Sequence, residues 1–524
     1  MRSWHCPDLP SLPGQGTIPV VWDTVTSSYV PSARPAHDDA TLFVCGITPY
    51  DATHLGHAAT YIAFDLLVRA WLDAGRVVRY AQCVTEVDDP LLERAASTGQ
   101  DWRELAASQI ELYRRDMEAL SVVPPTWYRG VEEQIPAIVR AVATMEEAGQ
   151  AYRVPLAAHD DGPRVGGVGA GGRGVGGVGA RGVGRAGDAD SARGAGCGEV
   201  GVGARGVGGE ADADSARGAG CGEVGAGVGG VGCCEGDVYA DLSCDPRFGE
   251  VAGFDRGVML SLFAERGGDP DRPGKRDSLD PLLWRAARPG EPAWQSPLGP
   301  GRPGWHIECA VIVHGCCGVP VDVQGGGADL LFPHHEMSTS HMRCLAGTRG
   351  GADVVGAQVH AGLISLGGEK MSKSLGNLVL VRGLIDSGVE PAAIRLALLS
   401  EHYRADRDWS DDLLLAAQAR LARWREGLGH EARGVSGGRV SGGGGPDGQV
   451  SGGAARGAGE IAAAKEESPR AYLVVERMRR ALALDLDAPS ALAAVDGFLG
   501  EGDTDGSSAR LVVDAISALL GVSL

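Results

Sequence analysis

Residues 42–84 read LFVCGITPYDATHLGHAATYIAFDLLVRAWLDAGRVVRYAQCV and contain the pattern that decides the fold. Leu42–Cys45 is apolar and ends at a glycine, which predicts a short strand. Residues 54–74 carry apolar side chains at helical spacing, with Thr53 as the expected N-cap and Gly75 as the stop. Val77–Val84 predicts a second buried strand. A strand, a helix and a strand at this spacing form a βαβ unit, so the sequence predicts an α/β fold with a parallel sheet.

The overall composition excludes several classes of protein. The chain has 524 residues, enough for two to four domains at roughly 100–200 residues each. Its formal net charge of −20 disfavours a large nucleic-acid footprint, because an acidic surface repels phosphates. No apolar run approaches the ~18 residues of a membrane span. The N-terminus lacks a signal-peptide pattern, so we expect a cytoplasmic protein. Twelve cysteines without a CxxC pair predict reduced thiols rather than a disulfide framework.

A glycine-rich insert interrupts this pattern at residues 165–236. It contains a tandem duplication, in which Gly179–Gly201 recurs as Gly203–Gly225. The repeats have no aromatic residue and no large apolar residue beyond valine, so they cannot bury a core that offsets chain entropy. We interpret the insert as a disordered surface loop that takes no part in the chemistry.

Order is expected to resume after the insert. Val319–Val323 predicts a strand that leads into a glycine turn at Gly325–Gly327, and 391–401 and 411–425 have helical periodicity. Residues 428–467 read as a second, Gly/Ser-rich linker. Ser468–Leu524 predicts two or three short helices, with five arginines against eight acidic residues, a net charge of 5 − 8 = −3.

Two motifs carry candidate chemistry. His54-Leu55-Gly56-His57 lies at the predicted strand-to-helix turn, where phosphates bind in such sheets, although a polar first helical turn would look the same. Lys370-Met371-Ser372-Lys373-Ser374 places two lysines on a glycine-flanked loop, which suits the charge that builds on a leaving pyrophosphate. The first motif is weak alone, and the second is more specific, although a solvated basic loop would look similar. The two together, in this order, are typical of class I aminoacyl-tRNA synthetase-type adenylate formers.

The resemblance becomes more specific in five segments. CGITPYDATHLGHA (45–58), VTEVDDPLLERA (84–95), GRPGWHIECA (301–310), GGGADLLFPHHE (325–336) and KMSKSLGN (370–377) resemble the cysteine-activating branch of that class. The resemblance implies a Rossmann-like (HUP-type) catalytic domain in two halves, 1–164 and 301–390. It also implies a connective region at 237–300 and a small helical C-terminal region at 391–524.

The resemblance also implies the site residues. Cys45, Cys309 and His334 lie where the branch binds one zinc ion, which spacing alone would not predict, with His335 and Glu336 as supporting neighbours. The catalytic residues would be His54, His57, Lys370 and Lys373. ATP, with Mg²⁺, would react with L-cysteine to form cysteinyl-adenylate. The residues implied to line that intermediate are Cys45, Gly46, Ile47, Thr48, Thr60, Cys83, Val84, Thr85, Trp305, Gly327, Ala328, Asp329 and Ile364. Cys83 departs from the asparagine common there, so a side-chain contact at that position is not implied.

The branch contains two kinds of enzyme, and both interpretations stay open. One kind charges tRNA with cysteine; the other, of mycothiol biosynthesis, joins cysteine to the amine of glucosaminyl-inositol. Four features favour the ligases: Ser338 where the synthetases have a fourth metal ligand, the run Cys45–Tyr50, the segment Glu265–Pro270, and the short acidic C-terminal part. On this interpretation we expect a monomer that does not bind tRNA. Arg266 and Asp269 are candidates for binding the sugar hydroxyls.

Overall fold

The computed structural model describes residues 1–35, 37–156, 236–347, 353–371, 376–429, 450–451, 458–500 and 505–524. The chain divides into one unit formed by Met1–Asp161 with Gly232–Leu524 and a second formed by Gly162–Val231. The second unit lies outside the described residues, and so does the predicted insert at 165–236 except for Gly236, which begins β7. Among the described helices, none combines the length and apolarity needed to cross a membrane.

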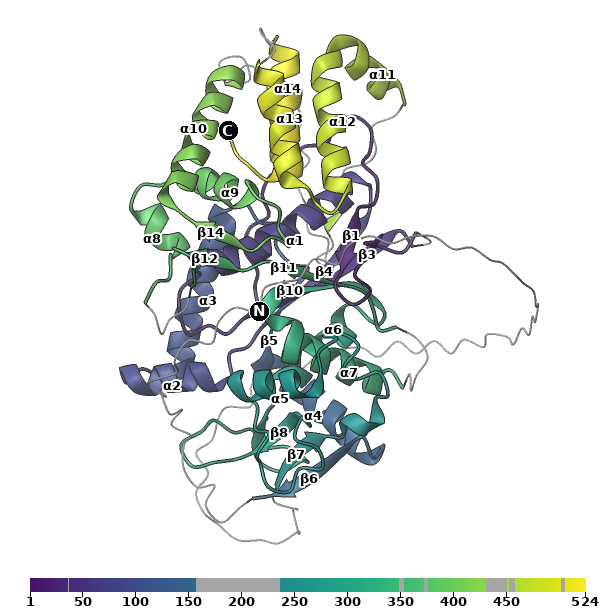
Figure 1. The fold of residues 1–524 in the computed structure, drawn as a ribbon, viewed down its shortest axis with the longest axis vertical. Coiled ribbons are helices and arrows are strands. Elements are labelled where there is room, and N and C mark those ends of the chain that lie inside the picture. Colours follow the sequence, from purple (N-terminus) through teal and green to yellow (C-terminus); the bar gives the residue numbers. More distant parts are fainter. Residues whose placement is uncertain are drawn as a thin grey trace, which may run out of the picture. The chain divides into compact units, whose positions relative to one another are not determined.

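Five parallel strands form the centre of the fold (Figure 1). Their order across the sheet is β11-β10-β3-β4-β5, and every neighbouring pair is parallel. The predicted strands coincide with β3 and β4, so the expected βαβ unit and the α/β class are confirmed. The short β15 adds to β4 antiparallel. The bounds are β3 (Asp39–Ile47), β4 (Val77–Val84), β5 (Trp127–Gly130), β10 (Val321–Gly327), β11 (Val355–Ala361) and β15 (Val450–Ser451).

The helix between β3 and β4 is α1 (Leu55–Asp73), and its start corrects one prediction. Its N-cap is His54, not Thr53: the His54 Nδ1 accepts a hydrogen bond from the Gly56 N–H at 3.1 Å. The chain stops the helix as expected, because Gly75 takes a positive φ of 76°. The motif histidine therefore also shapes the helix start.

The expected glycine turn at Gly325–Gly327 is wrong. These glycines are the last residues of strand β10. Their lack of side chains makes room for neighbours: a Cβ on Gly325 would lie 2.2 Å from Phe64 Cε1 in α1, and one on Gly326 would lie 3.0 Å from His335. The glycines let α1 and the His335 segment pack against the strand end.

The connective part forms an antiparallel sheet in the order β6-β7-β8-β9. Pro155 of β6 pairs with Gly236 of β7, so the two described ends that flank the insert lie side by side. The helical segments α6, η3 and α7 follow, and α6 packs on α4 and β4. The bounds are α4 (Val131–Glu147), β6 (Ala151–Pro155), β7 (Gly236–Ala240), η1 (Leu242–Cys244), α5 (Arg256–Glu265), β8 (Leu282–Ala286), β9 (Gly301–Pro303), α6 (Trp305–Cys316), η2 (Ala328–Leu330), η3 (Leu331–His335) and α7 (Glu336–Leu345).

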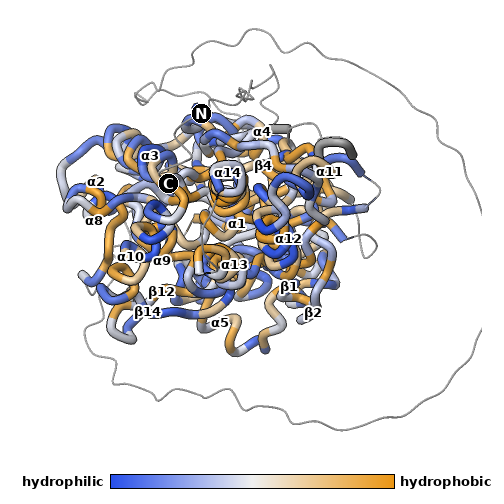
Figure 2. The backbone as a smooth tube through the Cα atoms, turned by 90° about the horizontal axis from the view of Figure 1, so that it is seen from above, coloured by the Kyte–Doolittle hydropathy of each residue, from blue (hydrophilic) through white to orange (hydrophobic). Residues whose placement is uncertain are grey.

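The C-terminal part is helical, as predicted, and shares one apolar core with α1 (Figure 2). The expected helices at 391–401 and 411–425 are α9 and α10, and the tail forms α12, α13 and α14. The last ten residues of the expected linker are helix α11, so the linker is helical at that end. The bounds are α8 (Val381–Asp386), α9 (Pro391–Leu399), α10 (Asp411–Leu428), α11 (Ala458–Glu467), α12 (Pro469–Ala483), α13 (Ala488–Gly500), α14 (Gly506–Ala515) and η5 (Ile516–Leu520).

The remaining elements are two small sheets and two helices. β1 and β2 form an antiparallel hairpin, and β12 pairs with both β13 and β14. The bounds are β1 (Val20–Asp23), β2 (Ser28–Pro31), α2 (Asp89–Thr98), α3 (Trp102–Ala119), β12 (Ile364–Leu366), β13 (Glu369–Lys370) and β14 (Arg407–Trp409).

Candidate active site and metal centre

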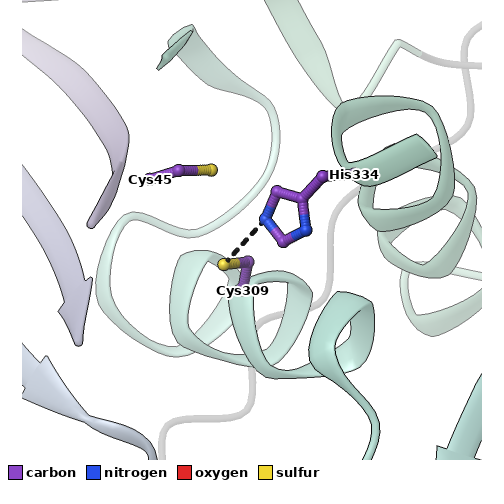
Figure 3. Close-up of side chains that lie close together, drawn as sticks. All are labelled: Cys45, Cys309 and His334. Atoms are coloured by element: carbon purple, nitrogen blue, oxygen red, sulfur yellow. Dashed lines mark hydrogen bonds between the residues drawn. The ribbon is translucent and has the colours of Figure 1, made fainter. Parts of the chain in front are cut away.

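Three side chains from distant parts of the sequence meet beside the carboxyl end of β3 (Figure 3). Cys45 comes from β3, Cys309 from α6 and His334 from η3. All three are buried, their ligand atoms lie within 4.8 Å of one another, and Cys309 Sγ is 3.2 Å from His334 Nε2. The structure thus brings together the trio that the resemblance implied, and this trio could hold a metal ion.

The protonation of the trio suits a soft cation. Burial raises the pKa of the Cys45 thiol, and a hydrogen bond with Cys45, together with burial, raises the pKa of Cys309 well above its usual value. Burial lowers the pKa of His334 to about 3, so its imidazole is neutral and can donate a lone pair. Without a cation, both thiols therefore stay protonated. They would ionise to thiolates only beside a positive charge, which a bound metal would supply.

Further rings hold the trio in place. Trp305 stacks on His334 with ring centroids 4.3 Å apart, and His306 Nδ1 lies 3.1 Å from His334 Nδ1. Cys45 Sγ lies 3.3 Å from His335 Nε2, whose Nδ1 lies 2.8 Å from His360 Nε2. Neighbouring imidazoles therefore orient both Cys45 and His334.

The two other residues expected near the trio have different partners. Glu336 accepts hydrogen bonds from the backbone N–H groups of Gly249 and Ala252, both at 2.8 Å, and so holds the connective region. Ser338 Oγ accepts from Gln324 Nε2 at 3.1 Å and donates to the His335 carbonyl at 3.3 Å. Neither residue joins the trio, so among the described residues the candidate metal ligands are Cys45, Cys309 and His334.

His54 and His57 lie together at the N-terminus of α1. Their rings stack with centroids 3.9 Å apart and an interplanar angle of 26°. The helix N-terminus and two imidazoles form a place where a phosphate can bind. Of the two lysines in the KMSKS motif, Lys370 is the last residue of β13, and Lys373 lies outside the described residues.

Most of the residues expected to line an adenylate lie at or directly after the carboxyl ends of β3, β4 and β10, whereas Thr60 lies on α1, Trp305 begins α6 and Ile364 begins β12. A Cβ on Gly327 would lie 2.7 Å from Asp329 Oδ1 and 3.8 Å from Thr60 Oγ1. Thr48 donates to Asp88 at 3.2 Å. Cys45, Gly46 and Ile47 end β3, Cys83 and Val84 end β4 with Thr85 directly after, Ala328 and Asp329 form η2, and Ile364 begins β12. β3 and β10 are neighbours in the sheet. From β3 the chain continues to β4 on one side, and from β10 it continues to β11 on the other side. Parallel sheets bind ligands where the strand order reverses in this way.

The candidate sugar-binding residues have structural partners. Arg266 donates hydrogen bonds to the carbonyl oxygens of Asp329 and Phe332. Asp269 accepts from the Tyr239 hydroxyl and pairs with Lys275 at 3.1 Å. Arg266 therefore ties the connective region to the segment that carries His334.

Sequence reasoning missed several polar groups of the site. His306 had a weak signal, since it lies one helical turn before Cys309 on α6; His360, on β11, had none. Glu308 is buried, and both of its carboxyl oxygens lack a hydrogen-bond partner among the described residues. Burial and, after it, the charge of Asp88 raise the pKa of Glu308 well above the usual range, so this carboxyl is neutral.

Comparison with known proteins places this geometry in a class. The model of the tRNA synthetases class I (C) catalytic domain matches residues 32–161 and 231–419. The fold agrees: a methionyl-tRNA synthetase from Mycobacterium tuberculosis, solved with methionyl-adenylate, superposes with a TM-score of 0.50 at 16% identity, covering 92% of this chain and 89% of the other. The chain therefore has a class I tRNA synthetase-type catalytic domain.

Two curated relatives narrow the class. Proteins from Cellulomonas flavigena and Xylanimonas cellulosilytica, each named L-cysteine:1D-myo-inositol 2-amino-2-deoxy-alpha-D-glucopyranoside ligase, are both 46% identical over all of this chain and all of their own. A third, from Mycolicibacterium paratuberculosis, is 43% identical with the same coverage. The chain belongs to the family of these ligases, which confirms the ligase prediction over the tRNA-charging alternative.

Proposed function

We propose that this chain activates L-cysteine with ATP and transfers it to the amine of glucosaminyl-inositol, the acceptor in its relatives' name. The products are cysteinyl-glucosaminyl-inositol, AMP and pyrophosphate. The observation that carries the proposal is the buried Cys45–Cys309–His334 trio beside the carboxyl ends of the parallel strands. The trio would recognise the substrate thiol, and the strand ends beside it would bind the nucleotide. We propose that the enzyme acts as a cytoplasmic monomer.

Selection of cysteine would take place at the trio. Cys45, Cys309 and His334 would hold zinc, which supplies a soft cation with a fourth position suited to a substrate thiolate. Serine, the closest competitor in shape, offers only a hard and weakly acidic hydroxyl. One bond of this kind discriminates better than an apolar pocket could. Trp305, stacked on His334, would cover the bound side chain.

Adenylate formation needs no general base. The cysteine carboxylate attacks the α-phosphorus of ATP, the bond to the bridging oxygen breaks, and pyrophosphate leaves. Catalysis therefore consists of positioning and charge stabilisation. His54 and His57, at the start of α1, would bind the phosphates; Lys370 and Lys373, with Mg²⁺, would bind the departing pyrophosphate.

Transfer follows at the same edge of the sheet. The neutral amine of glucosaminyl-inositol attacks the carbonyl carbon of the mixed anhydride. The bond between that carbon and the phosphate oxygen breaks, AMP leaves, one proton is released, and an amide remains. A sugar acceptor suits this chain better than tRNA does, because tRNA needs a cationic track and the chain carries −20 overall.

Exchange of labelled pyrophosphate into ATP tests the first step. We expect exchange that depends on cysteine and is absent with serine. Lys373→Ala should lower its rate by orders of magnitude, because that lysine acts on charge that develops in the transition state. Lys465→Ala, on the surface of α11, is the matched control and should leave the rate unchanged. Equal exchange with serine, or full activity in Lys373→Ala, would overturn the proposal.

A further inference from the structure

A third buried thiol lies against the metal-site trio. Cys83, near the end of β4, is 2% exposed, and its Sγ lies 3.4 Å from Cys309 Sγ. The Cys83 sulfur also accepts a hydrogen bond from the Gly46 N–H at 3.2 Å. The strand and the helix thus hold two sulfurs in contact, one of which belongs to a proposed metal ligand.

We propose that Cys83 and Cys309 are an oxidation site, at which a peroxide links the two sulfurs and removes the Cys309 thiolate from the metal site. The part about the metal rests on the proposed function of the trio. The disulfide itself requires only the two sulfurs and the loss of one thiol proton. Hydrogen peroxide is the oxidant that we assign by chemical class.

The geometry favours this pair. A disulfide needs the sulfurs about 2.0 Å apart, so they must approach by roughly 1.4 Å. Rotation of side chains on two packed elements, β4 and α6, can supply a movement of that size. Cys45 is the competing partner, within 4.8 Å of Cys309, but its sulfur contacts His335 at 3.3 Å and belongs to the trio itself.

The reaction balances with one peroxide. The Cys309 thiolate attacks a peroxide oxygen, the O–O bond breaks, and a sulfenic acid and hydroxide form. The Cys83 thiol then attacks the sulfenic sulfur, and the leaving hydroxyl takes the Cys83 proton and departs as water. The proton that Cys309 lost on ionisation neutralises the hydroxide. Two thiols and one peroxide give a disulfide and two waters; the sulfurs lose two electrons and the peroxide gains them. Cys309 can then no longer be a thiolate ligand, and Cys45 and His334 remain alone.

Access follows from the substrate. On the proposed function, free cysteine must reach Cys45, Cys309 and His334, the last of which stacks on the Trp305 ring. Peroxide is smaller than cysteine and can take the same route. Oxidation of Cys309 in the folded protein therefore does not require unfolding.

The test oxidises the zinc-loaded full chain with hydrogen peroxide. Released zinc is followed with a chelating dye, and disulfides are mapped by mass spectrometry of non-reduced peptides. Wild type, Cys83→Ser and the control Cys316→Ser are compared, and a metal-free sample is oxidised in parallel. Cys316 is a half-buried thiol further along α6.

We expect a Cys83–Cys309 linked peptide in wild type and in Cys316→Ser, formed as zinc is released and reversed by a dithiol with added zinc. In Cys83→Ser the linked peptide should be lost, and oxidation should leave sulfinic acid at Cys309, which a dithiol does not reverse. A Cys45–Cys309 link, or zinc release in Cys83→Ser that a dithiol still reverses, would overturn the proposal. Cysteine-dependent pyrophosphate exchange, measured before oxidation, reports separately on the proposed function. A wild type that forms the linked peptide but never binds zinc would contradict the metal assignment and not the disulfide.

Discussion

At the scale of single residues, the metal-site trio buries three ionisable groups close together. Cys45, Cys309 and His334 are neutral and buried without a metal. Burial raises the pKa of Cys45 and lowers that of His334, and the hydrogen bond with Cys45, together with burial, raises the pKa of Cys309. Binding of a divalent cation would pay for ionisation of both thiols and release their protons. We therefore expect the two thiols of the trio to ionise only when a cation binds.

Replacement of a trio member tests this directly. Cys309→Ala and His334→Ala should each lose zinc, because two remaining ligands hold it too weakly. Metal analysis of purified protein gives the readout, with Cys316→Ala on the same helix as the control that keeps one zinc per chain. Stoichiometric zinc in either trio variant would remove the ligand assignment.

Glu86, two residues after the end of β4, makes the stability of the protein depend on pH. Burial raises the pKa of Glu86 from 4.5 to about 7, although its carboxyl accepts hydrogen bonds from the Val131 and Glu132 N–H groups at the start of α4. The folded protein keeps the proton after the unfolded chain has lost it. The contribution of Glu86 to stability is thus complete below pH 4.5 and is lost as the pH rises to about 7.

Glu86→Gln should remove that pH dependence. The amide stays neutral and can still accept from Val131. Relative to the variant, wild type should lose on the order of 1 kcal/mol of unfolding free energy per pH unit across that range. Urea unfolding of both proteins over the range provides the measurement. Parallel stability curves would show that Glu86 is ionised throughout.

At the scale of elements, the glycines of β10 set how closely α1 approaches the sheet. Gly325→Ala should destabilise the protein by about 1–3 kcal/mol, because the new Cβ would meet the buried Phe64 ring. Gly315→Ala is the matched control: nothing lies within 4 Å of its Cβ position on α6, so it should be neutral or stabilising by at most about 1 kcal/mol. Thermal unfolding compares the two, and equal melting temperatures would contradict this packing.

The elements also show what the sequence can predict. Periodicity and turn residues predicted β3, α1 and β4 because their signals are local. The glycine run of β10 predicts a turn when only its neighbours in the sequence are considered. The residue that requires a glycine there, Phe64, lies far away in the sequence. His54 displaced Thr53 as the cap for a similar reason: backbone direction decides which of two polar neighbours meets the helix N–H groups. The trio needed the family resemblance, because no spacing links Cys45 to Cys309. The contact of Cys83 with Cys309 depends on packing of α6 on β4 and has no sequence signal.

At the scale of the whole molecule, a buried ion cluster joins the C-terminus to the catalytic domain. Asp65 of α1 pairs with Arg69 at 2.7 Å and with Arg395 of α9, and all three side chains are at most 1% exposed. The arginines also donate to carbonyl oxygens of η5, at Ser517 and Leu520. Burial alone would raise the pKa of Asp65, but Arg395 and Arg69 outweigh it and lower the pKa.

Asp65→Asn should destabilise the protein by about 3–5 kcal/mol, because it leaves two buried guanidinium groups without a counter-charge. Glu111→Gln, which removes an exposed partner of Arg115, should cost less than about 1 kcal/mol. Chemical unfolding measures both changes. A cost for Asp65→Asn as small as that of the control would mean that the cluster does not tie the C-terminal part down.

The central claim is that activated cysteine goes to a sugar amine. The most direct test supplies the enzyme with labelled cysteine, ATP, glucosaminyl-inositol and total tRNA in one reaction and follows the label by mass spectrometry and acid precipitation. We expect cysteinyl-glucosaminyl-inositol and AMP in equal amounts, with no label on tRNA. Label that accumulates on tRNA at a comparable rate, with no amide product, would contradict it.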